Sequence, residues 1–107
     1  MKNKFIIRVF FDFSAISCLW TGNDNAESRW GYNINLDKFP ISENLKSLII
    51  SAQNDFENLV DLNFKAKNDK KLEADQLNKK CIEIIHLLKN ELGDEFSIID
   101  RLKIETT

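Results

Sequence analysis

The architecture depends on one run of residues, Phe5-Ile6-Ile7-Arg8-Val9-Phe10-Phe11-Asp12-Phe13. With the two-residue period of a β-strand, five apolar side chains share one face: Phe5, Ile7, Val9, Phe11 and Phe13. The opposite face is mixed and carries Ile6, Arg8, Phe10 and Asp12. Because this strand is too hydrophobic for an edge exposed to water, we expect a central strand with helices on its aromatic face.

Two more strand-like segments follow. Cys18-Leu19-Trp20 is short and apolar, and the stretch 30–36 alternates apolar residues with asparagine or glycine. The polar stretch 21–28 between them is rich in glycine and asparagine, which favour turns. The pattern therefore predicts a hairpin whose two strands are joined by a long loop.

Apolar residues at helical spacing predict two amphipathic helices, at 42–62 and at 72–92. Ser42 is suited to cap the first helix at its N-terminus, and Gly93 is suited to end the second. A polar, lysine-rich connection at 63–71 separates the two helices.

A final strand is expected at 96–104. Asp100 falls on its apolar face, so the strand either bulges there or ends early. Pairing of this strand with the first one keeps the phenylalanine-rich run off the sheet edge, and the two helices must bury their stripes on that run. The sequence therefore predicts one α+β domain over residues 1–107. It has a small antiparallel sheet of three to four strands, two helices on one face and the order β-β-β-α-α-β.

The charge of the chain disfavours nucleic acid as a partner. The formal net charge is −2 and the pI is about 5.4, whereas nucleic-acid binders usually carry a basic excess. The apolar N-terminal run is broken by Arg8 and Asp12, unlike a signal peptide or a transmembrane span. We therefore expect a cytoplasmic protein that binds neither nucleic acid nor membrane, with its oligomeric state left open.

Two cysteines and one histidine are the residues with the greatest potential for nucleophilic or metal chemistry. Cys18 and Cys81 are expected as buried free thiols, although their spacing does not exclude a disulfide. Zinc sites need three or four Cys or His ligands at short spacing, and His86 has no such neighbours. We therefore expect no metal, no cofactor and no enzyme activity. An alternative is a small enzyme or ligand-binding domain that uses Cys18, Trp20 and His86.

Five short motifs resemble those of a group of small bacterial proteins. They are Cys18-Leu19-Trp20, Gly31-Tyr32-Asn33-Ile34, Phe39-Pro40-Ile41-Ser42-Glu43-Asn44-Leu45-Lys46, Leu62-Asn63-Phe64 and Glu91-Leu92-Gly93. The group resembles, or lies among, the immunity proteins of bacterial toxin systems, including contact-dependent growth inhibition. The chain departs from the group at Phe64, where tryptophan is more usual, and in the connection after it, which is lysine-rich instead of proline-rich.

The resemblance implies an inhibitor that binds the C-terminal domain of a cognate toxin in the cytoplasm and blocks its active site. Such toxins are often nucleases with basic clefts, so exposed carboxylates would favour association. The expected contact residues are Asp24, Glu27, Trp30, Tyr32, Asp55, Glu57 and Asp61. Two other interpretations stay open: the loop is a plain solvated connection with Trp30 and Tyr32 in the core, or the protein is an adaptor without a toxin partner.

Overall fold

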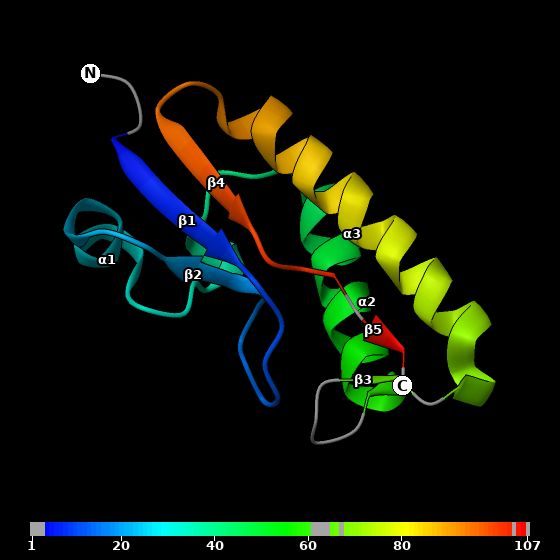
Figure 1. Ribbon diagram of the computed structural model, residues 1–107. Helices are drawn as coiled ribbons and strands as arrows, with labels where there is room; N and C mark the ends of the chain where they lie inside the picture. Colours follow the sequence, from blue (N-terminus) through cyan, green and yellow to red (C-terminus); the bar gives the residue numbers. More distant parts are fainter. Residues whose placement is uncertain (1–3, 61–64, 67, 104, 107) are drawn as a thin grey trace.

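The computed structural model describes residues 4–60, 65–66, 68–103 and 105–106 of the chain. Its main body is a three-stranded sheet with two long helices on one side (Figure 1). In chain order the elements are β1 (Phe5–Val9), β2 (Leu19–Thr21), α1 (Asp24–Trp30), the 3-10 helix η1 (Leu36–Lys38), α2 (Glu43–Leu59), β3 (Lys65–Ala66), the 3-10 helix η2 (Asn68–Lys70), α3 (Lys71–Leu92), β4 (Phe96–Asp100) and β5 (Glu105–Thr106). The α+β class is confirmed.

Strand β1 lies in the middle of the sheet, whose order is β2-β1-β4. Its residues Phe5, Ile7 and Val9 are buried because every second side chain of the strand faces the core. The predicted central position of this strand and its pairing with the last long strand are confirmed. However, β1 pairs antiparallel with β2 and parallel with β4. The sheet is therefore mixed, and the expectation of an antiparallel sheet is wrong.

β4 runs parallel to β1 because of how the ends of the two long helices are placed. At the start of α2, the backbone N–H of Ser42 donates to Glu91 Oε1 at 2.6 Å, and its hydroxyl donates to Oε2 at 2.8 Å. The end of α3 therefore lies beside the start of α2. Just after Gly93, the carbonyl of Glu95 accepts from the N–H of Phe5 at 2.9 Å. The chain thus enters β4 where β1 begins, and must run parallel to it.

Both long helices begin and end close to their predicted residues. Ser42 caps α2, because its Oγ accepts from the N–H of Leu45 at 3.2 Å. Gly93 ends α3 with a φ of 75°, in the left-handed region that favours glycine. Of the stripe expected for α3, five residues are buried, namely Leu77, Cys81, Ile84, Ile85 and Leu88, whereas Leu92 is half-buried; Ala74 is buried in addition. Sequence periodicity therefore identified most of the buried residues, but Gln53 of α2, which was expected on the outer face, is buried.

The first strand is shorter than expected, since it ends at Val9 and not at Phe13. The chain then turns, and Ser14 adopts a φ of 60°. Phe11 and Phe13 still pack against Phe56 of α2, with ring centroids 4.9 and 5.0 Å away. The apolar alternation therefore marks the buried residues correctly but continues beyond the hydrogen-bonded strand.

The last long strand also ends before its predicted limit, at Asp100. The carboxylate of Asp100 accepts a hydrogen bond from the N–H of Leu102 at 3.0 Å, and Leu102 itself is buried. This contact turns the chain and leaves the Asp100 side chain exposed. Of the two outcomes that the sequence allowed, an early end is confirmed.

The segment 21–36 differs most from the prediction, because it forms α1 where a loop was expected. The side chain of Asn23 caps this helix, and asparagine is among the best N-cap residues. The predicted strand at 30–36 is wrong: only an isolated bridge between Trp20 and Asn33 remains of the hairpin. The observed order is therefore β-β-α-α-α-β, with the short β3 and β5 paired separately in parallel.

The two cysteines are buried and form no disulfide, as expected. Burial raises the pKa of the Cys81 thiol from its ordinary 9.0 to about 12, and the nearby Asp100 carboxylate adds to the rise. Burial also raises the pKa of Cys18 far above its usual range, with a smaller contribution from Cys81. Both thiols therefore stay protonated in the folded protein at neutral pH.

These pKa values predict a loss of stability in alkali. Above pH 9 the unfolded chain loses the Cys81 proton while the folded chain keeps it until about pH 12. Over this window the thiol lowers the free energy of unfolding by about 1.4 kcal/mol per pH unit. We expect Cys81→Ala to show a shallower decline of stability than the wild-type chain in urea denaturation at pH 8 to 11, because the variant lacks this thiol and only Cys18 still contributes. An equal slope in both proteins would contradict the prediction.

Candidate functional site

The residues with the greatest potential for catalysis do not form a catalytic arrangement. Cys18 has no exposed surface, and a thiol whose pKa is raised is a poor nucleophile at neutral pH. His86 lies on the exposed side of α3, where its Nε2 is 3.1 Å from Asn90 Nδ2. Within the described ranges, no three His, Cys, Asp or Glu side chains are grouped so that they could hold a metal ion. In the described part of the chain, Cys18 is therefore shielded from substrate while His86 lies at the surface beside Asn90.

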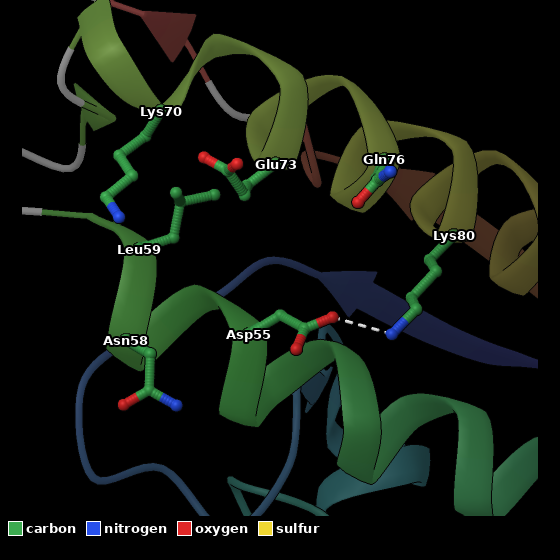
Figure 2. Close-up of a pocket in the computed structure, with 7 residues that line it drawn as sticks. All are labelled: Asp55, Asn58, Leu59, Lys70, Glu73, Gln76 and Lys80. Carbon is green, nitrogen blue, oxygen red and sulfur yellow. Dashed lines mark hydrogen bonds and ion pairs between the residues drawn. The ribbon is translucent and has the colours of Figure 1, made fainter.

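The carboxylates expected on α2 are engaged within the protein. Asp55 Oδ2 lies 2.6 Å from Lys80 Nζ on α3, and this ion pair links the two helices (Figure 2). Glu57 Oε2 accepts from the backbone N–H of Ser14 at 3.0 Å and from Gln53 Nε2 at 2.8 Å. These contacts hold the loop after β1 against α2. Asp61 lies outside the described residues, as do Phe64 and the motif around it.

The Asp55–Lys80 pair borders a hollow of about 290 Å³ between α2 and α3. Most of the side chains around it end in a polar group (Figure 2), and the lining consists of Asp55, Asn58, Leu59, Lys70, Glu73, Gln76 and Lys80. The side chains carry both signs of charge and converge on no common point. The hollow has the character of a solvated gap between two helix surfaces.

The other expected contact residues lie near α1, away from those of α2. Asp24 and Glu27 are exposed on this helix, whereas Trp30 is half-buried. The Trp30 ring packs edge-on against Phe5 and Phe39, with centroids 4.9 and 5.0 Å away. Trp30 thus lies at the start of β1, whereas Glu57 contacts Ser14, which lies beyond the end of β1. The expected contact residues therefore form two separate groups, one near α1 and one on α2.

A better-formed surface lies on the side of the sheet opposite α2 and α3 (Figure 1). We call it the open sheet face. Strand register places Trp20 and Ile99 on either side of Arg8, with all three side chains on this face. The face consists of Ile6, Arg8, Phe10, Trp20, Tyr32, Ser97 and Ile99. Exposure varies over the face: Tyr32 is 55% exposed and Ile99 is 37% exposed, the other residues except Trp20 are half-buried, and Trp20 is buried at 8%.

Aromatic rings surround the arginine at the centre of the open sheet face. Phe10 stacks on Trp20 with centroids 4.6 Å apart, and Tyr32 meets Trp20 edge-on at 5.3 Å. The Arg8 guanidinium carbon lies 5.7 Å from the Phe10 centroid and 5.5 Å from the Tyr32 centroid. Tryptophan, tyrosine and arginine are the residue types that contribute most often to protein–protein binding energy. The arrangement is therefore suited to binding another protein.

Gly22 allows the side chains of this face to lie as they do. A Cβ atom at Gly22 would be only 2.7 Å from Cγ2 of Ile6 and 3.3 Å from Cγ of Arg8. The N–H of Gly22 donates to the carbonyl of Ile6 at 2.7 Å, which holds the two backbones together. Ile6 cannot move away easily because a β-branched side chain is stiff at χ1.

Of the residues on the open sheet face, the sequence analysis singled out Tyr32 but not Arg8, Phe10 or Ile99. The available signal was the mixed face of the strand Phe5–Phe13. Its residues alternate with the core residues, and they are only partly polar. Once both helices are assigned to one side of the sheet, this mixed face must be the one that they leave open.

A family model described as Serratia CdiI immunity protein-like matches residues 6–100 of the chain. The match includes both long helices, the whole open sheet face and the three strands of the main sheet except Phe5. No curated protein gives a match to the chain. No helix in the described part of the chain combines the length and the apolar character needed to cross a membrane.

Proposed function

Because the chain belongs to the Serratia CdiI immunity protein-like family, we propose that it neutralises a cognate toxin domain by covering that domain's active site. A protein of this family is an immunity protein of contact-dependent growth inhibition, and its partner is a toxin protein. We further propose that the partner is the C-terminal domain of the toxin, that it is a nuclease, and that the two meet in the cytoplasm. The immunity protein itself catalyses no reaction in this mechanism.

The open sheet face is the observation that carries this proposal. It combines exposed Tyr32 and Ile99 with a central Arg8, and the two long helices leave it uncovered. Large exposed apolar patches on soluble proteins, especially those with polar residues at their edge, mark interaction sites. An inhibitor needs only a rigid, shaped surface, and a sheet packed on two helices provides one.

Carboxylates on α1 are proposed as the outer part of the same interface. Asp24 and Glu27 are exposed and make no ion pair within the described part of the chain. Against a basic nuclease cleft they would speed association and favour the cognate toxin. The exposed part of Trp30 would lie beside them. Asp55, Glu57 and Asp61 are secondary candidates, since the first two have partners within the chain.

The proposal is tested by co-expression with the polypeptide encoded immediately upstream. We expect that polypeptide to stop growth when expressed alone, and growth to be restored when this chain is present. The two proteins should also co-purify. If the upstream polypeptide is harmless, or if it remains toxic in the presence of this chain and does not bind it, the proposed function is wrong.

Replacing Tyr32 by alanine is expected to weaken binding to the toxin domain about 30-fold, the effect of losing an interface hot spot of about 2 kcal/mol. Tyr32 is 55% exposed, so the free energy of unfolding should fall by less than about 1 kcal/mol. Isothermal titration calorimetry and urea denaturation measure the two effects. The matched control is Ile50→Ala on α2, where an equally exposed apolar side chain (51%) is removed away from the open sheet face. Equal affinities for both variants would contradict the assignment of this face.

A further inference from the structure

Arg8 lacks the partners that a guanidinium in its surroundings normally has. Its Nη2 donates to the carbonyl of Thr21 at 3.2 Å. Its Nε is buried and has no hydrogen-bond partner. Among the described residues, no carboxylate lies within ion-pair distance of Arg8. Within the described part of the chain, Arg8 therefore carries a positive charge that no carboxylate balances, and its buried Nε–H group donates no hydrogen bond.

The surroundings hold this charge in one place. The rings of Phe10 and Tyr32 lie against the guanidinium, and the Thr21 carbonyl fixes one of its nitrogens. The aliphatic part of Arg8 lies over Gly22, where any larger residue would push it away. A side chain that is ordered before binding loses less conformational entropy when a partner arrives. Arg8 is therefore preorganised, and its donors are not yet satisfied.

A carboxylate can both balance the charge of this guanidinium and accept hydrogen bonds from its N–H groups. The planar guanidinium donates two parallel hydrogen bonds to the two oxygens of one carboxylate. Once a partner covers the open sheet face, water leaves the guanidinium, and an uncompensated charge there would be costly. The partner must therefore supply an anion at this point and an apolar surface around it for Ile6, Tyr32 and Ile99. A protein surface with a carboxylate inside an apolar patch meets both requirements, and a nucleic acid lacks the apolar surround.

We propose that Arg8 is the specificity anchor of the toxin interface, and that it pairs with an Asp or Glu side chain of the toxin domain at the centre of the open sheet face. The inference rests on the proposed function and adds to it the chemical group that the partner must present. It also predicts that the carboxylates of this chain contact the toxin at the rim of the interface, whereas at the centre this chain supplies the positive charge and the toxin the negative one.

The test compares Arg8→Gln and Arg8→Lys with the wild-type chain. Affinity for the C-terminal domain of the upstream polypeptide is measured by calorimetry, and thermal denaturation confirms that each variant is folded. We expect Arg8→Gln to weaken binding about 100-fold, in the range found when one partner of a buried charge pair is lost. Arg8→Lys should weaken it about 10-fold, because lysine keeps the charge but cannot donate two parallel hydrogen bonds. The control is Lys79→Gln, which removes one positive charge from an exposed position on α3 and should leave affinity unchanged.

Neutralising each toxin carboxylate in turn identifies the partner group. One Asp→Asn or Glu→Gln change in the toxin domain should weaken binding as much as Arg8→Gln does, and the double variant should lose little more. Wild-type affinity in Arg8→Gln, or additive losses with every toxin carboxylate, would overturn the inference while the proposed function stands. So would an RNA oligonucleotide that binds the wild-type chain but not Arg8→Gln, since the anion would then be a phosphate. If the wild-type chain itself does not bind the toxin domain, the proposed function fails.

Discussion

Phe56→Ala is expected to destabilise the protein by about 3–5 kcal/mol, the range found when a buried phenylalanine is truncated. Phe56 is only 1% exposed, and its ring packs against both Phe11 and Phe13. These two residues follow β1 and lie outside the sheet, in the segment that connects β1 to β2. The variant would therefore lose buried surface, leave a cavity and release the segment that connects β1 to β2. Urea denaturation monitored by circular dichroism measures the loss.

A matched variant separates the loss of the ring from the loss of volume. Phe56→Leu keeps most of the apolar volume and should cost less than half as much as Phe56→Ala, because small cores tolerate changes that conserve volume. A domain of this size has a total stability of about 5–15 kcal/mol, so the alanine variant should lose a large part of its stability and unfold at a much lower urea concentration than the wild-type chain. Full stability of Phe56→Ala would contradict the packing described for α2.

Trp30→Ala is the second large effect, with an expected loss of about 2–4 kcal/mol, somewhat below that for a fully buried tryptophan. The Trp30 ring contacts Phe5 of β1, Phe39 and Phe96 of β4, at centroid distances of 4.9, 5.0 and 5.7 Å. It therefore joins α1 to both strands. Aromatic pairs of this kind add about 0.5–1.5 kcal/mol each beyond the area that they bury.

The same variant distinguishes a packing role from a binding role. If Trp30 acts mainly in packing, Trp30→Ala loses stability, and its folded fraction still binds the toxin domain more tightly than Tyr32→Ala does. Trp30→Phe should recover most of the stability. A fully stable Trp30→Ala protein that fails to bind the toxin domain would instead make this ring a principal contact residue.

The parts of the fold that depend on local pattern could be predicted from the sequence. Ser42, Gly93 and the helical stripes lie where periodicity and capping chemistry place them. The direction of β4 could not be predicted, because it depends on the contact between Ser42 and Glu91, which are 49 residues apart. The helix α1 was missed because it is only seven residues long, and the alternation that begins at Trp30 has the period of a strand.

The candidate site was predictable only in part, because it also depends on contacts between residues that are far apart in the chain. Tyr32 was identified from its residue type and its position after a polar segment. Asp55 and Glu57 were expected to be available for binding, yet their partners Lys80 and Ser14 lie 25 and 43 residues away in the chain. Arg8 was visible as a charged residue in an apolar strand, but its missing partners become apparent only when the neighbouring side chains are in place.

The alternation of inward and outward residues in β1 affects how proteins of this family can diversify. The odd-numbered residues Phe5, Ile7 and Val9 maintain the core, whereas the even-numbered Ile6 and Arg8 face outward. At the interface that we propose, substitutions of the outward residues would change the fit to the toxin, while the inward residues keep the molecule folded. In β1, therefore, neighbouring codons encode residues with different roles: one maintains the folded core and the next shapes the outer surface.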